Sequence, residues 1–224
     1  MNTSMIRYIL GNILKLQALF LLLPAITAMI YRENTLVPYL VVAMSCLVLG
    51  FMMTWRKPKD TVFYLKEGCV ATALSWIELS VTGAFPFVLT GEIPGFVDAL
   101  FEMVSGFTTT GSSILSNVEA LSRSSLMWRS FSHWVGGMGV LVFLLAVIPM
   151  SGGSNINLMK AESPGPSVGK LVPKIRSTAR ILYMIYIGLG VLMFLLLLCG
   201  KMPIFDALTT TFGTAGTGGF GIRE

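Results

Sequence analysis

The chain has 224 residues, of which 54% are hydrophobic and 12% are charged, and its mean hydropathy is +0.77. A soluble domain carries about 25% charged residues, so this composition excludes a soluble globular enzyme, and the high apolar content excludes a disordered chain. The formal net charge of +5 arises from basic residues in short runs between apolar segments, and we expect no nucleic-acid partner.

Five segments are long and apolar enough to cross a bilayer, which requires about 20 residues. They are residues 10–31, 36–55, 69–90, 131–149 and 181–199. A signal peptide is an alternative interpretation of the first segment, but no small-residue cleavage site follows it and four more spans do. The pattern therefore predicts an all-α polytopic protein whose first partner is the lipid bilayer.

Two shorter apolar segments, residues 94–108 and 203–214, are each about half a membrane long. Each follows an apolar span, begins near a proline, which suits a first helical turn, and ends in a run of threonine and glycine. Segments of this length and setting predict half-helices that enter the membrane and turn back.

The charges predict an orientation. Eleven of the sixteen basic residues lie at the N-terminus, in the loop 55–68 or in the loop 150–180. The positive-inside rule places these segments in the cytoplasm, so both half-helices enter from outside. Seven of the eleven acidic residues lie on that outer side, which favours cations there.

A glycine-, proline- and serine-rich segment, residues 151–173, predicts a linker between structural units. We therefore expect three parts. They are an accessory pair of transmembrane helices (1–58), a first pore repeat (59–150), and a cytoplasmic loop followed by an incomplete second pore repeat (151–224).

The two half-helices belong to an internal repeat with an offset of 108 residues. Five of fourteen positions are identical between 98–111 and 206–219, including Thr109 with Thr217 and Gly111 with Gly219. Both copies follow a membrane span and end in threonine and glycine, so the predicted unit is helix, half-helix, extended loop, helix.

Threonine and glycine at these places suit a cation path. A cation that crosses lipid must exchange its water for protein oxygen, and backbone carbonyls supply this without formal charge. Successive carbonyls face one axis only if the backbone enters regions that glycine adopts freely, as Gly111 and Gly219 would. The alternative interpretation is that both stretches are ordinary turns between helices.

Four segments carry a resemblance to a known family. They are DALFEMVSGFTTTGSS (98–113), SHWVGGMGVLVF (132–143), AESPGPSVGKLVP (161–173) and FDALTTTFGTAGTGGF (205–220). In this order and spacing the chain, from about residue 70 to its end, resembles the N-terminal half of TrkH/TrkG-type potassium-uptake subunits of the Trk/Ktr/HKT superfamily.

The resemblance implies four tandem units around one pore, a glycine-containing selectivity-filter strand from each, and potassium as the transported ion without any cofactor. The implied ion-binding filter positions are Thr109, Thr110, Gly111, Ser112, Thr217, Gly218, Gly219 and Phe220. It also implies an inner-membrane homodimer, and a TrkA-like ring of nucleotide-binding regulatory proteins docked on the cytoplasmic side at the loop 150–180.

The chain departs from that family because it stops at Glu224, after two of the four filter strands. We expect a fragment of a longer transporter. A sodium-dependent Ktr-type subunit and a truncated, non-conducting assembly partner remain as alternatives.

Several polar residues have two interpretations each. Glu78, in the middle of a span, predicts either a cation- or proton-coupled site or a packing residue. Asp98 and Asp206, near the starts of the half-helices, predict either compensation of the helix dipole or attraction of cations. His133 with a nearby serine imitates a hydrolase pair, but no orienting acid follows, and we expect a structural role and no enzyme.

Overall fold

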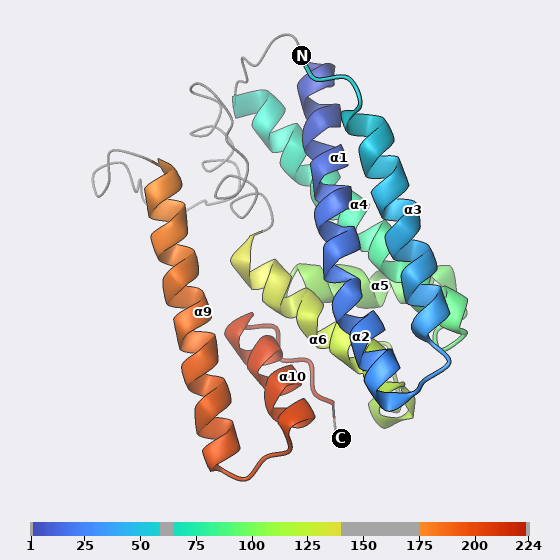
Figure 1. Ribbon diagram of the computed structural model, residues 1–224, viewed down its shortest axis with the longest axis vertical. Helices are drawn as coiled ribbons and strands as arrows, with labels where there is room; N and C mark the ends of the chain where they lie inside the picture. Colours follow the sequence, from blue (N-terminus) through green and yellow to red (C-terminus); the bar gives the residue numbers. More distant parts are fainter. Residues whose placement is uncertain (1, 59–64, 140–174, 223–224) are drawn as a thin grey trace.

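The computed structural model describes residues 2–58, 65–139 and 175–222, and every regular element in these ranges is a helix (Figure 1). The elements are α1 (Thr3–Phe20), α2 (Leu22–Tyr31), α3 (Leu36–Thr54), α4 (Leu65–Thr90), α5 (Phe96–Phe107), the 3-10 turn η1 (Val118–Ala120), α6 (Arg123–Met138), α9 (Ile175–Cys199) and α10 (Ile204–Ala215). The predicted all-α class is confirmed.

Within the described residues, four helical segments are long and apolar enough to span a membrane. They are Thr3–Tyr31, Leu36–Thr54, Lys66–Thr90 and Arg180–Cys199. The first comprises α1 and α2 and begins seven residues before the predicted span. The two helices separate at Leu21 because Pro24 has no amide hydrogen to donate to Phe20, four residues earlier.

The two predicted half-helices are confirmed as α5 and α10. Each has 12 residues, a length of about 18 Å against a hydrocarbon core of about 30 Å. Each begins beside a proline, Pro94 or Pro203, and each carries an aspartate in its first turn. The prolines and the dipole-compensating acids favour a helix start at these two places.

The first part of the fourth predicted span, 131–149, lies in helix α6 (Arg123–Met138). Helix α6 begins at Arg123, eight residues earlier, where the hydroxyl of the N-cap residue Ser122 accepts a hydrogen bond from the Ser125 amide. Hydropathy missed this start because the first turns of α6 are polar residues that are buried inside the protein, such as Ser124 and Arg129. Residues 140–149 lie outside the described residues, as do the predicted linker 151–173 and residues 150–174 of the predicted docking loop.

The accessory helices α1 and α3 pack through two glycines. A Cβ atom at Gly11 would lie 2.8 Å from Cβ of Met53, and one at Gly50 would lie 2.7 Å from the carbonyl oxygen of Gly11. The backbones therefore approach more closely than larger residues would allow. The pair then buries Ile9, Ile13 and neighbouring apolar side chains against α4 and the core.

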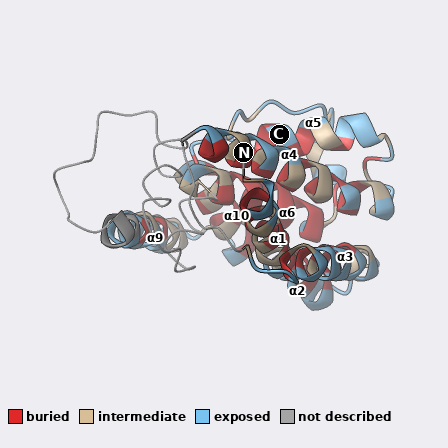
Figure 2. Ribbon diagram, turned by 90° about the horizontal axis from the view of Figure 1, so that it is seen from above, coloured by how far each residue is buried: buried red, intermediate tan, exposed pale blue. Residues whose placement is uncertain are grey.

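Helix α6 occupies the centre of the molecule, and most of its residues are buried (Figure 2). It contacts α2 of the accessory pair, α5 of the first half-helix unit and α10 of the second. Helix α9 lies to one side, packs on α10, and exposes most of its apolar surface (Figures 1 and 2). The position of α6 therefore determines how the two half-helices are placed relative to each other.

Candidate functional site

The two half-helices end in the same hydrogen-bonded turn. We name residues 108–113 the first Thr-Gly loop and residues 216–221 the second. The Thr109 amide donates to the Gly106 carbonyl at 3.1 Å, and the Thr217 amide donates to the Thr214 carbonyl at 2.9 Å. Two more bonds match: Thr108 N to Val104 O (2.9 Å) with Gly216 N to Phe212 O (3.1 Å), and Thr110 N to Ser105 O (2.9 Å) with Gly218 N to Gly213 O (3.0 Å). Every pair is related by the offset of 108 residues, so the sequence repeat is also a backbone repeat.

The backbone dihedrals repeat as well. The φ angles are 54° at Thr109 and 57° at Thr217, then 76° at Gly111 and 81° at Gly219. Glycine adopts a positive φ freely, whereas a β-branched threonine does so at a cost of about 1–2 kcal/mol. The turn is that of a Schellman-type helix end, in which glycine usually takes the position that threonine occupies here.

The two Thr-Gly loops lie directly against each other. A Cβ atom at Gly111 would stand 1.9 Å from the carbonyl oxygen of Gly218, which no side chain tolerates. A Cβ atom at Gly219, in contrast, would meet nothing within 4 Å. The equivalent glycines therefore differ: Gly111 is required by contact as well as by φ, and Gly219 by φ alone.

Helix α6 supports both loops through its own close approaches. A Cβ at Gly136 would lie 2.2 Å from the Phe107 carbonyl oxygen at the end of α5. A Cβ at Gly216 would lie 2.2 Å from the carbonyl oxygen of His133 in α6. The glycines let the backbone of α6 touch the starts of both loops.

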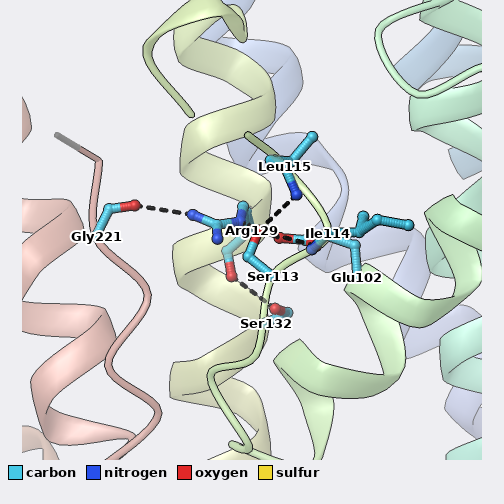
Figure 3. Close-up of polar contacts among 7 residues, drawn as sticks. All are labelled: Glu102, Ser113, Ile114, Leu115, Arg129, Ser132 and Gly221. Atoms are coloured by element: carbon cyan, nitrogen blue, oxygen red, sulfur yellow. Dashed lines mark hydrogen bonds and ion pairs between the residues drawn. The ribbon is translucent and has the colours of Figure 1, made fainter. Parts of the chain in front are cut away.

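A buried ion pair joins α5 to α6 behind the loops (Figure 3). Arg129 Nε lies 2.5 Å from Glu102 Oε1, and the two residues are 2% and 0% exposed. The Glu102 carboxylate also accepts bonds from the Ser113 hydroxyl, at 3.0 and 3.2 Å, and from the Ile114 amide, at 3.1 Å. Glu102 therefore holds the end of the first Thr-Gly loop.

The same arginine holds the second Thr-Gly loop (Figure 3). Arg129 Nη1 donates to the carbonyl of Gly221 at 2.8 Å, and its guanidinium lies 3.7 Å from the centre of the Phe220 ring. The Phe220 ring also stacks on the imidazole of His133, with centroids 4.0 Å apart and an interplanar angle of 26°. Arg129 and Glu102 thus link two loops that lie about one hundred residues apart in sequence.

The predicted filter residues differ in exposure. Thr110, Ser112, Thr217 and Gly219 are exposed, Thr109 and Gly111 are half-buried, and Gly218 and Phe220 are buried. The Gly218 α-carbon faces His133, because a Cβ there would lie 2.3 Å from the imidazole ring. The structure therefore brings the eight residues together in two adjoining loops, with the Phe220 side chain packed behind them.

The three predicted accessory acids lie outside the Thr-Gly loops. Asp98 folds back over Gly95 at the start of α5, and a Cβ at Gly95 would lie 2.6 Å from its Oδ2 atom. Asp206 lines an open cleft between the start of α10 and Gly221. Glu78 lies within α4, and its Oε2 atom is buried without a hydrogen-bond partner among the described residues.

Sequence reasoning counted Glu102 and Arg129 only as outer-face charges and missed their pairing. The available signal was a charged residue amid apolar neighbours in each of two helices, because such charges are buried only when they are paired. Nothing in the local sequence pattern indicates that Glu102 and Arg129, 27 positions apart, face each other.

Comparison with known proteins agrees with this geometry. The family model TrkH, described as a cation transport protein, matches residues 39–224. The chain belongs to the TrkH family. The family that the four motifs predicted is confirmed. Because the match begins at residue 39, the family resemblance also includes the second apolar span, which the motifs did not cover.

Individual TrkH-family relatives match over almost the whole chain. The Trk system potassium uptake protein TrkG of Escherichia coli (strain K12) is 35% identical over 98% of this chain and 47% of its own length. The Trk system potassium uptake protein TrkH of the same strain is 34% identical over 100% and 47%. The crystal structure of the potassium transporter TrkH from Vibrio parahaemolyticus has a TM-score of 0.82 at 29% identity, over 100% of this chain and 45% of that chain.

The chain therefore spans about half the length of the TrkH-family relatives that it matches. Together with the four apolar helices, the family membership shows a membrane-embedded protein.

Proposed function

We propose that this chain forms two of the strands that line the ion path of a potassium-uptake transporter. The observation that carries the proposal is the matched backbone of the two Thr-Gly loops, with Gly111 and Gly219 at similar positive φ angles, 76° and 81°, after two half-helices. The naming of relatives as potassium uptake proteins supports potassium as the ion.

In this proposal potassium exchanges its hydration water for backbone carbonyl oxygens of the two loops. The loop residues are Thr109, Thr110, Gly111, Ser112, Thr217, Gly218, Gly219 and Phe220. The C-terminal ends of α5 and α10 lead into the loops, and the partial negative charge of a helix C-terminus favours a cation there. The ion then moves down its electrochemical gradient under control from the cytoplasmic side.

Two loops cover only part of an ion, so other strands must complete the site. The relatives are about twice as long as this chain, which supports a longer protein that carries the remaining strands. By the same resemblance we propose a homodimer in the inner membrane, and from the distribution of basic residues we propose a cytoplasmic N-terminus. The nucleotide-binding, TrkA-like ring would dock at the loop 150–180.

The accessory acids take structural roles in this proposal. Asp98 and Asp206 lie in the first turns of α5 and α10, where a carboxylate offsets the positive end of the helix dipole. Glu78 lies within α4, and we propose that it serves packing between helices.

The test is substitution of the loop glycines in the full-length protein that contains this chain, reconstituted in liposomes. Gly111→Ser and Gly219→Ser should each lower the ratio of potassium to sodium permeability severalfold, because serine at a positive φ displaces the neighbouring carbonyls. Gly219→Ser is the decisive variant, since a Cβ there meets nothing within 4 Å and the substitution acts through the positive φ alone. Gly91→Ser is the matched control, because Gly91 has a φ of 77° in the turn after α4, with open space around it.

Each outcome is informative. An unchanged permeability ratio in Gly219→Ser would refute the ion-path assignment. Selective potassium uptake that requires sodium would identify a Ktr-type subunit. A reconstituted protein that conducts no ion would favour the non-conducting assembly partner.

A further inference from the structure

The N-terminus of α6 is held by a carboxylate from the accessory helix pair. Glu33 lies in the turn between α2 and α3, and its Oε1 atom accepts the Arg123 amide at 2.7 Å. Its Oε2 atom accepts the Ser124 amide at 3.0 Å. Both oxygens therefore bind the first two backbone amides of α6, which have no partner within the helix itself.

A second carboxylate, from another turn of the chain, binds the same N-terminus of α6. Glu92, in the turn between α4 and α5, accepts the Ser122 amide at 2.7 Å and a short bond from the Ser125 hydroxyl. The Ser125 hydroxyl also lies 2.9 Å from the hydroxyl of Tyr39 in α3. Ser122, Ser124 and Ser125 at the N-terminus of α6 therefore bind three residues from other parts of the chain. These are Glu33, Glu92 and Tyr39.

The junction extends to the second half-helix. The guanidinium of Arg123 lies 4.4 Å from the centre of the Tyr31 ring, at the end of α2, and 5.2 Å from that of Phe205, at the start of α10. The Tyr31 and Phe205 rings contact each other edge to face, with centroids 5.7 Å apart. The accessory pair therefore contacts both half-helix units at this one place.

The consequence for the Thr-Gly loops follows from helix geometry. Ser125, Arg129 and His133 are spaced four residues apart and lie along one face of α6. Ser125 is held at the junction, Arg129 binds Gly221, and His133 packs on Gly218. A helix advances about 1.5 Å per residue, so an axial slip of α6 by one residue would break the contacts of both loops.

We propose that Glu33 is a positioning residue that sets the axial register of α6 and, through α6, the geometry of the two Thr-Gly loops. This inference rests on the proposed function, since its effect is read as ion selectivity. It assigns the accessory helix pair a role in ion discrimination that acts through its contact with α6.

A different explanation is that Glu33 merely adds to the acidic character of the outer face and attracts cations. Glu119 separates the two ideas, because it is an exposed glutamate in η1 that the charge pattern assigns to the same side of the membrane as Glu33. Glu119→Gln removes the same charge as Glu33→Gln and leaves the N-terminus of α6 intact.

The experiment compares Glu33→Ala, Glu33→Gln and Glu119→Gln in the full-length protein in liposomes, with reversal potentials giving the potassium-to-sodium permeability ratio. This ratio does not depend on the amount of folded protein, so a general loss of stability does not move it. We expect Glu33→Ala to lower the ratio at least threefold, and Glu33→Gln to lower it less, because an amide keeps one acceptor oxygen. Glu119→Gln should leave the ratio unchanged.

The outcomes separate the inference from the function on which it rests. If both Glu33 variants leave the ratio unchanged while Gly219→Ser lowers it, the positioning role is overturned and the ion path stands. If Gly219→Ser has no effect either, the proposed function itself fails. If Glu33→Gln and Glu119→Gln reduce uptake equally, and salt abolishes the difference from wild type, the outer-face charge explains Glu33 and the positioning role is refuted. Should Glu33→Ala fail to accumulate, Glu33→Gln alone decides between these results.

Discussion

Removal of the Arg129 side-chain charge should destabilise the protein strongly. Arg129→Met keeps an apolar stem against Phe220 but leaves the Glu102 carboxylate buried without its counter-charge. Breaking one side of a buried pair costs about 3–5 kcal/mol, because the remaining charge stays desolvated. The lost bond to Gly221 also frees the end of the second Thr-Gly loop, so selectivity should fall together with stability.

A second substitution, Glu102→Gln, should restore part of the stability that Arg129→Met removes. Adding Glu102→Gln to Arg129→Met removes the uncompensated charge, while the amide oxygen still accepts the Ile114 amide. The double variant should therefore be more stable than Arg129→Met alone, although its selectivity stays low because Gly221 remains unbound. Such non-additivity is expected only for residues in direct contact.

The assay is thermal unfolding of the full-length protein in detergent, followed by tryptophan fluorescence, with the permeability ratio measured in parallel. Arg32→Met is the matched control, since Arg32 is an exposed arginine at the end of α2. An unchanged midpoint in Arg129→Met, or a double variant less stable than the single one, would refute the reasoning.

Two further predictions concern the loops. Gly218→Ala should destabilise by about 1–3 kcal/mol through overpacking, because its Cβ would lie 2.3 Å from the His133 ring. Adding His133→Ala to Gly218→Ala should recover part of the lost stability in the thermal unfolding assay. A further decrease in stability would contradict the contact between Gly218 and His133. Thr217→Gly should raise stability by up to about 1 kcal/mol, since relief of the positive φ of 57° exceeds the entropy cost of glycine. A lower unfolding midpoint would show that the threonine side chain stabilises the turn instead.

Much of the local structure followed from the sequence because its causes are local. Pro94 and Pro203 favour helix starts, and the Thr-Gly runs end both half-helices at the predicted places. Five identical positions in the sequence indicate a repeat with an offset of 108 residues. The structure shows the same offset in matched hydrogen bonds and φ angles. A short segment carries this information because φ preferences and helix caps act within a few residues.

Helix α6 begins before the apolar span that the sequence predicted, for a physical reason that hydropathy does not contain. Its first turns carry serines and Arg129, whose polar groups bind Glu33, Glu92 and Glu102 inside the protein. A buried polar residue resembles an exposed one in sequence until its partner is known. The helix was therefore predicted only from the point at which its residues become apolar.

The sequence by itself thus determined the membrane-spanning helices, the paired half-helices and the glycines, Gly111 and Gly219, at which the two Thr-Gly loops adopt a positive φ. Only the tertiary structure decided which residues meet. Gly111 touches Gly218, and Glu102 pairs with Arg129. Glu33 binds the N-terminus of α6, which lies about ninety residues later in the chain. Helix periodicity and turn chemistry depend on neighbours in the chain, whereas these contacts depend on the packing of whole helices through glycines. That packing gives each buried charge its partner.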